Sequence, residues 1–208
     1  MKYIVKLDEP DDLAKWKADA NDNWQPSYKN MPSDIKNSVK SSLSKEQGGI
    51  CCYCERRLDM NDSHIEHFKP QSEYPADSLA YSNMLCSCQS KIDKKEPRHC
   101  GILKENWFDK ELLVSPFDQT CQKRFAFLGN GEIKPNNDND PAAVKTIKNL
   151  GLGIPKLNSL RAKAIEPFLD ENLSDNELQQ FVSSYLRKDS EGQFGEFWTT
   201  VDYLFRKQ

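Results

Sequence analysis

The residues best suited to chemistry lie in one stretch, His64-Ile65-Glu66-His67-Phe68-Lys69-Pro70, between two groups of cysteines. Cys51-Cys52-Tyr53-Cys54 precedes the stretch, and Cys86, Cys88 and His99-Cys100 follow it. All three histidines of the protein therefore fall between positions 64 and 99. Thiols are soft metal ligands, and imidazoles and carboxylates can bind metals or move protons. Their concentration in one part of the chain predicts a metal site, a catalytic site, or both.

The cysteine spacing predicts a zinc site. Cys51-x-x-Cys54 is the spacing that lets two thiolates reach one tetrahedral zinc ion from a tight turn. The candidates for the second pair of ligands are Cys86, Cys88 and Cys100, with His99 as a nitrogen alternative. Cys86-x-Cys88 is one residue too short for a regular pair, so Cys88 with Cys100 also fits. Four thiolates would leave no open coordination position, which makes such a zinc structural rather than catalytic.

Glu66 and His67 are the candidate catalytic pair. On a strand, adjacent side chains point to opposite faces, so the two residues can do different jobs at one centre. Glu66 offers a carboxylate oxygen to a divalent cation such as Mg²⁺ or Mn²⁺, and His67 can take a proton from water near neutral pH. His64 shares the face of Glu66 and is a second candidate ligand or an orienting group. A general base beside a cation suits phosphodiester hydrolysis. Pro70 and the spacing argue against the His-Glu-x-x-His helix of zinc proteases.

Composition sets the class of protein. The chain has 208 residues, 37% hydrophobic and 29% charged, with a formal net charge of −3. No apolar run approaches the ~20 residues that a membrane span needs, and the charged N-terminus lacks a signal-peptide core. We therefore expect a cytoplasmic protein, in which seven cysteines favour metal binding over disulfides. The near-neutral charge provides no global basic field, so nucleic acid would have to be bound by a local patch or a bound cation.

Three regions are expected to position these residues, in an α+β fold. Residues 1–48 read as a helical segment, with Ser33 capping a helix that Gly48-Gly49 ends. Residues 49–110 form the cysteine and histidine module, with a short strand at 64–68 and a strand-to-helix passage at 80–88. Residues 111–208 read as a hairpin followed by helices that pack on the module or dock a partner.

Within the last region, the hairpin is predicted from residues 124–128 and 132–135, joined through Gly129-Asn130-Gly131. Helices follow from apolar spacing, one of them with Val144, Ile147 and Leu150 on its buried face. Ser174 with Glu177 predicts a capping box for another. The final helix carries Phe197, Trp198, Val201 and Leu204, which we interpret as core.

The module resembles an HNH endonuclease, the ββα-metal nuclease in its zinc-braced form, here embedded in a mainly α-helical chain. The family pattern is a Cys-x-x-Cys pair, an acid-His pair followed by Pro, an Asn about fifteen residues later, and a second cysteine pair. Its counterparts here are Cys51 and Cys54, Glu66-His67 with Pro70, Asn83, and Cys88 with Cys100. The resemblance implies that His67 is the general base, that Glu66 binds the catalytic metal, and that Asn83 holds the loop that orients His67.

Further motifs resemble the PtuB-like branch of this family, the nuclease subunit of Septu-type and retron-associated anti-phage systems. They include residues 49–55, His64 to Ser72, His99-Cys100-Gly101 and Gly131 to Pro135. The resemblance implies a nucleic-acid substrate and a PtuA-like ATPase partner, with a retron reverse transcriptase and its msDNA as a further candidate partner. It does not distinguish DNA from RNA. The competing interpretation is a zinc-stapled adaptor without catalysis. A thiol redox protein is a more distant alternative, because no βαβ pattern surrounds Cys51-x-x-Cys54.

Two positions depart from the family pattern. The second cysteine pair is not Cys-x-x-Cys, which leaves the fourth zinc ligand between Cys86 and Cys100, with Cys100 favoured. The last metal ligand of the family has no clear counterpart, and its candidates are Ser90, Asp93 and His99. Basic residues in the module are candidate phosphate contacts, namely Arg56, Lys69, Lys91 and Lys104.

Overall fold

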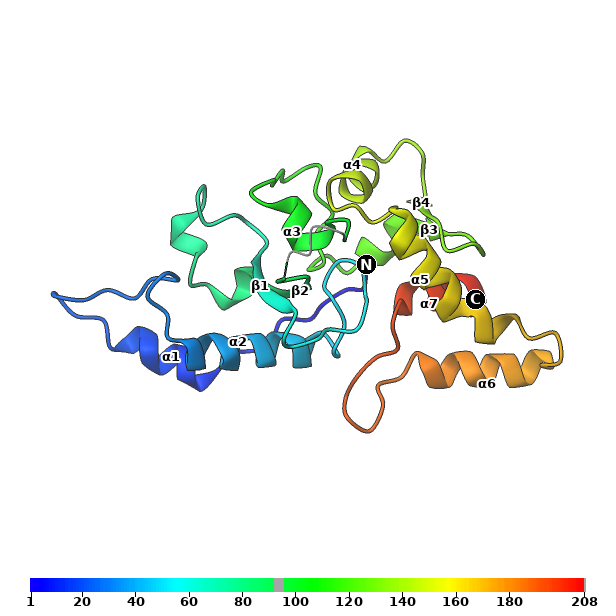
Figure 1. Ribbon diagram of the computed structural model, residues 1–208, viewed down its shortest axis with the longest axis horizontal. Helices are drawn as coiled ribbons and strands as arrows, with labels where there is room; N and C mark the ends of the chain where they lie inside the picture. Colours follow the sequence, from blue (N-terminus) through cyan, green and yellow to red (C-terminus); the bar gives the residue numbers. More distant parts are fainter. Residues whose placement is uncertain (92–95, 208) are drawn as a thin grey trace.

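The computed structural model describes residues 1–91 and 96–207. The molecule is elongated, with α1 and α2 towards one end and α6 towards the other (Figure 1). The helices are α1 (Asp11–Ala18), α2 (Ser33–Glu46), α3 (Cys100–Lys104), α4 (Pro141–Asn149), α5 (Pro155–Ile165), α6 (Asp175–Tyr185) and α7 (Trp198–Phe205). The strands are β1 (Ser63–His67), β2 (Met84–Cys88), β3 (Phe125–Phe127) and β4 (Ile133–Pro135). This mixture of helices and two small sheets confirms the α+β class.

The N-terminal region contains the predicted helix, α2, which buries Val39 and Leu43. The predicted cap is wrong: Ser33 is the first helical residue, and Pro32 precedes it without a side-chain cap. Proline suits this place because its ring fixes φ near the value that the chain needs there. Gly48 and Gly49 follow the helix at φ values of +67° and +73°, a backbone conformation that glycine adopts without strain.

The central module is a two-stranded antiparallel sheet followed by the short helix α3. β1 pairs with β2 in a register that sets His64 opposite Ser87 and His67 opposite Met84. The predicted strand-to-helix passage at 80–88 occurs in the reverse order, since a 3₁₀ turn at Tyr81–Asn83 leads into β2. β2 is buried along its whole length, so its apolar run lacks the alternation that marks a half-exposed strand.

The C-terminal region follows the predicted pattern. β3 and β4 form an antiparallel hairpin, with Phe125 opposite Pro135. The Ser174 side chain accepts from the Glu177 N–H while Glu177 bonds back to Ser174, so the capping box is confirmed. The buried face of α4 is partly wrong, because Val144 is 43% exposed while Ala142, Ala143 and Thr146 are buried. Within residues 1–91 and 96–207, none of the helices has the length and apolar character of a membrane span.

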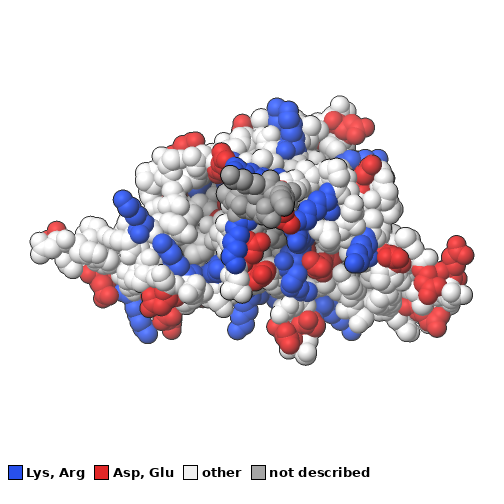
Figure 2. Space-filling view, in the orientation of Figure 1, with Lys and Arg blue, Asp and Glu red and all other residues white. Residues whose placement is uncertain are grey.

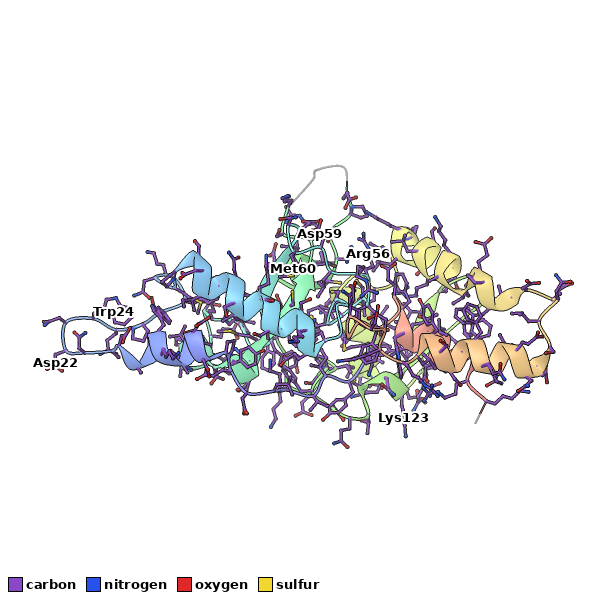
Figure 3. All side chains as sticks on the ribbon, turned by 90° about the horizontal axis from the view of Figure 1, so that it is seen from below. Asp22, Trp24, Arg56, Asp59, Met60 and Lys123 are labelled. Atoms are coloured by element: carbon purple, nitrogen blue, oxygen red, sulfur yellow. The ribbon has the colours of Figure 1, made fainter. Side chains whose placement is uncertain are left out.

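Two apolar clusters hold the chain together. The larger one draws on the N-terminal helices, the central module and α4–α5, from Met1 to Leu157, and includes the buried cysteines Cys51 and Cys54. The smaller one joins Ile50 to α5, α6 and α7. Asp22 and Trp24 lie in the loop that projects at the end of the long axis (Figure 3). The larger cluster therefore joins the N-terminal helices, the central module, α4 and α5 in one core.

Candidate functional site

Four cysteines from three segments form one cluster. Ligand atoms of Cys51, Cys54, Cys88 and Cys100 all lie within 4.8 Å of one another, and all four residues are buried. Burial would raise the pKa of the Cys51 thiol, but hydrogen bonds from the neighbouring thiols, with Cys100 first, hold it well below its ordinary value. Four converging sulfurs of this kind fit a tetrahedral soft-metal site, so the cluster could hold a metal ion such as zinc.

Backbone contacts bring the cysteines together. Cys51 and Cys54 lie in a tight turn in which the Glu55 N–H donates to the Cys51 carbonyl at 3.1 Å. The backbone N–H of Cys88, at the end of β2, donates to Cys51 Sγ at 3.4 Å. Cys100 is the first residue of α3, and its N–H donates to the Leu150 carbonyl at 2.8 Å. The loop after α4 thus fixes the fourth cysteine.

The two alternative zinc ligands lie differently. Cys86 is buried outside the cluster, and burial raises the pKa of its thiol to about 12, as for an ordinary core cysteine. His99 is also fully buried, with Nδ1 3.0 Å from Cys100 Sγ. His99 therefore lies against the cysteine cluster, as a neighbour of Cys100 rather than a member of the four-sulfur set.

Glu66 is buried in β1, where its carboxylate contacts Tyr53, His64 and Lys104. Its Oε1 accepts from Tyr53 Oη at 3.1 Å and lies 2.9 Å from Lys104 Nζ. Its Oε2 lies 3.5 Å from His64 Nε2, which agrees with the expectation that the two residues share a face of the strand. Burial alone would raise the pKa of the Glu66 carboxyl, but His64 and Lys104 lower it below its ordinary value. The carboxylate is therefore ionised at neutral pH.

The His67 ring is held at both nitrogens. Nε2 lies 2.9 Å from the Ser78 carbonyl oxygen, which can only accept, so we assign the ring proton to Nε2. Nδ1 then carries the lone pair and accepts from the Gln71 amide at 3.2 Å. Burial lowers the pKa of His67, and the Ser78 carbonyl and Glu66 act against that effect. The geometry leaves a neutral imidazole with one basic nitrogen beside an exposed glutamine.

Asn83 ties down the loop that follows His67. Its Oδ1 accepts from the Lys69 N–H at 2.9 Å, and its Nδ2 donates to the carbonyls of Lys69 and Asp77 at 3.0 and 3.2 Å. Its backbone carbonyl also accepts from the Phe68 N–H at 2.9 Å. Asn83 thus fixes the segment next to His67 and the loop that carries Ser78.

A groove of about 370 Å³ brings these side chains to the surface. β1 contributes His64, Glu66 and His67 to its lining, and α3 contributes Gly101. A Cβ on Gly101 would lie 2.5 Å from Glu66 Oε2 and 2.6 Å from His64 Nε2, so only glycine leaves this space open. An ionised carboxylate oxygen beside an imidazole nitrogen, with room next to both, fits a divalent cation.

Two of the three candidates for the last metal ligand, Ser90 and His99, do not line this groove. Ser90 bonds to Asp62 at the surface, and His99 lies at the cysteine cluster. Asp93 lies outside the described residues. Glu105 and Asn106, at the end of α3, line the groove instead. Sequence reasoning missed them because α3 is only five residues long and shows no periodic pattern.

The candidate phosphate contacts fall in different places. The Lys104 side chain is only 1% exposed and faces Glu66, so its proposed role as a phosphate contact is corrected to a buried partner of the carboxylate. Lys69 is paired with Asp77 at 2.8 Å, Lys91 is exposed and Arg56 is half-buried near the middle of the molecule (Figure 3). Basic and acidic side chains are interspersed on the face in Figure 2. Arg98, whose side chain is 50% exposed, is a basic residue that lines the groove itself.

Similar proteins carry a shared description. Protein-family models give no match to this chain. The "Retron Vc95 putative HNH endonuclease" of Vibrio cholerae serotype O1 biovar El Tor is 31% identical over 139 residues, which cover 64% of this chain and 65% of that relative. The "Retron Ec83 putative HNH endonuclease" of Escherichia coli is 26% identical over 245 aligned positions, which cover 99% of this chain and 94% of that relative. The chain thus spans just under two thirds of the first relative and nearly all of the second.

Proposed function

We propose that this chain is a metal-dependent endonuclease of the HNH type that hydrolyses phosphodiester bonds of nucleic acid. The observation that carries the proposal is the groove in which Glu66 Oε2 and His64 Nε2 lie 3.5 Å apart and which His67 also lines. The similarity to two retron proteins described as HNH endonucleases supports the same chemistry. So does the chain order, in which two antiparallel strands are followed by a helix around these residues.

His67 is the proposed general base. Its Nε2–H donates to the Ser78 carbonyl, which fixes the ring so that Nδ1 can take a proton from an attacking water. Gln71 contacts Nδ1 in the structure and, being exposed, can give way to water or to a phosphate. Asn83 is the residue that keeps the Ser78 loop in place.

Glu66 and His64 are the proposed ligands of the catalytic cation, Mg²⁺ or Mn²⁺. A cation bound there would stabilise the charge that builds on the scissile phosphate and its leaving oxygen. Cys51, Cys54, Cys88 and Cys100 are the proposed ligands of a structural zinc ion. Because four thiolates complete its coordination, that zinc would stabilise the fold and take no part in cleavage.

The proposed setting is anti-phage defence of the retron type. The names of the two similar proteins place them with retrons, and the PtuB-like motifs suggest a PtuA-like ATPase as partner. A retron reverse transcriptase with its msDNA is the second candidate partner. The substrate is DNA or RNA, and residues 111–208, part of which pack into the main core, are the proposed docking region for the partner.

A cleavage assay tests the proposal. We expect the purified protein, alone or with its ATPase partner and ATP, to cut supercoiled DNA, single-stranded DNA or RNA when Mn²⁺ or Mg²⁺ is added. Cleavage should stop when the Mg²⁺ or Mn²⁺ is withheld from protein that still carries its full zinc content. Absence of cleavage on all three substrates, with the partner present, would contradict the proposal and favour the non-catalytic adaptor.

Replacing Gly101 with alanine is expected to slow cleavage ~10–100-fold, the usual effect of disturbing the surroundings of a metal ligand. The added Cβ would lie 2.5 Å from Glu66 Oε2 and 2.6 Å from His64 Nε2, in the space proposed for the cation. Gly101 lies inside α3, where alanine is favourable, so the backbone itself should tolerate the change.

The matched control is Gly129→Ala, because no atom lies within 4 Å of the Cβ that it adds. Cleavage rates are measured against Mn²⁺ concentration, together with the melting temperature and the zinc content. If Gly101→Ala cuts as fast as Gly129→Ala across the range, the space beside Gly101 is not the cation site.

A further inference from the structure

The two carboxylate oxygens of Glu66 have different surroundings. Oε1 receives the Tyr53 hydroxyl at 3.1 Å and the Lys104 ammonium at 2.9 Å. Oε2 faces His64 and the space beside Gly101, and both of those residues line the groove. Oε1 is thus bound by two protein donors, while Oε2 lies beside two residues that line the groove.

The two residues that donate to Oε1 are both buried in the protein interior. Tyr53 is 1% exposed and Lys104 is 2% exposed. The Lys104 ammonium also donates to the His67 carbonyl at 3.0 Å, so it joins the backbone of the base to the carboxylate next to it. A buried ammonium is costly unless it is paired and hydrogen-bonded, and Lys104 meets both conditions only in this geometry.

Both donors also belong to segments that the cysteine cluster joins. Tyr53 lies between Cys51 and Cys54, and Lys104 lies four residues after Cys100, about one helical turn along α3. The first residue of α3 and the turn at Cys51–Cys54 are brought within 4.8 Å of each other at the sulfur atoms. The cysteine cluster therefore constrains the positions of Tyr53 and Lys104 relative to Glu66.

We propose that Tyr53 and Lys104 are positioning residues for Glu66, which hold Oε1 so that Oε2 alone is presented to the divalent cation. This inference rests on the proposed function, since it concerns how the same carboxylate binds the cation. It predicts that the cation is bound through one oxygen of Glu66, and that its affinity depends on two residues that do not touch it.

The chain contains a second trio of the same composition, which provides matched controls. Glu46 receives the Tyr81 hydroxyl at 3.2 Å and forms an ion pair with Lys6. Lys6 also donates to a strand carbonyl, that of Met84, at 3.0 Å. Met84 is the residue paired with His67 across the sheet, so the two lysines make equivalent bonds on opposite strands. Glu46 is not among the residues that line the groove.

The test measures Mn²⁺ binding by isothermal titration calorimetry on the zinc-loaded, full-length protein. We expect Tyr53→Phe and Lys104→Met to weaken binding ~10–100-fold, the range found when outer partners of a metal ligand are removed. Tyr81→Phe and Lys6→Met should bind as the wild type does. Zinc content and melting temperature show whether each variant is folded.

Charge alone predicts the opposite sign for Lys104→Met, because removing a positive charge next to Glu66 should tighten the binding of a cation. Weaker binding therefore reports the loss of orientation, and binding as tight as that of the controls, or tighter, would overturn the inference. If Lys104→Met does not fold, Tyr53→Phe decides the question, since it keeps the ion pair intact. If the wild-type protein neither binds Mn²⁺ nor cuts nucleic acid, the proposed function itself is contradicted. If the wild type does both, and Tyr53→Phe and Lys104→Met bind Mn²⁺ as tightly as the wild type, only this inference is contradicted.

Discussion

Replacing His67 with alanine is expected to lower the cleavage rate ~10²–10⁴-fold, the usual contribution of a positioned general base. The ring has one basic nitrogen, Nδ1, and its other nitrogen is committed to the Ser78 carbonyl. The lost group binds neither the zinc cluster nor the proposed cation, so zinc content and Mn²⁺ affinity should stay near the wild-type values. The rate is measured at saturating Mn²⁺ on whichever substrate the wild type cuts.

A second substitution separates chemistry from packing. The His67 ring contacts Tyr28 edge-on, with ring centroids 4.6 Å apart, so alanine also leaves a small cavity. Glutamine at position 67 fills much of that space and can donate to the Ser78 carbonyl, but it has no basic nitrogen. His67→Gln should therefore be as inactive as His67→Ala while melting closer to the wild type. Cleavage at the wild-type rate in either variant would remove His67 from the role of base.

Replacing Cys54 with serine is expected to abolish zinc binding and to unfold the central module. A structural zinc contributes roughly 10–16 kcal/mol of binding free energy in zinc-finger peptides, and much of that energy is folding energy. Domains are typically stable by only about 5–15 kcal/mol, so losing this contribution is enough to remove the native state. Mass spectrometry of the metal content and thermal unfolding by circular dichroism measure the two effects.

Cys86→Ala is the matched control for Cys54→Ser. It removes a fully buried thiol from the same strand as Cys88, but one that lies outside the four-sulfur cluster. This variant should keep its zinc and lose only the stability that a small cavity costs. If Cys54→Ser and Cys86→Ala lowered the melting temperature equally, and both kept the metal, the cluster would not be a structural metal site.

The sequence predicted the parts of the site that depend on local spacing. Two cysteines three residues apart must share a turn. Strand alternation places His64 on the same face as Glu66, and the 3.5 Å between His64 Nε2 and Glu66 Oε2 agrees with this. Spacing left the fourth member of the cluster open between Cys86 and Cys100; the preference for Cys100 came with the family resemblance, and the structure places Cys100 in the cluster. These features depend on few residues and short distances along the chain.

Long-range contacts account for what the sequence did not reveal. Lys104 reads as one more basic residue of a charged segment, and only the packing of α3 against the β1–β2 sheet, where it contacts β2, buries its ammonium against Glu66. Tyr53 likewise reads as part of the cysteine turn, although its hydroxyl reaches the carboxylate. Gly101 has no side chain to mark it. Its proposed role follows from the close approach of Glu66, because a Cβ added at Gly101 would lie 2.5 Å from Glu66 Oε2.

The fold shows the same division. The hairpin of β3 and β4 and the capping box of α6 follow from turn and cap residues and are confirmed. The order of turn and strand at 80–88 was wrong because β2 is buried on both faces and lacks a periodic signal. The Ser33 cap was wrong because Pro32 occupies the position before the helix.

The cysteine cluster also bears on the order of events during synthesis. Cys54 and Cys88 enclose the stretch of chain that carries Glu66, His67 and Asn83, and Cys100 closes a second loop behind it. A chain emerging from the ribosome without metal holds these residues on a long flexible loop, whose closure costs conformational entropy. If the cluster binds zinc as proposed, capture of the metal is the step that brings them to one place. If the chain is also the defence nuclease proposed above, a newly made copy would be harmless to its own cell until its metal is loaded, and the supply of that metal would set how soon cleavage begins.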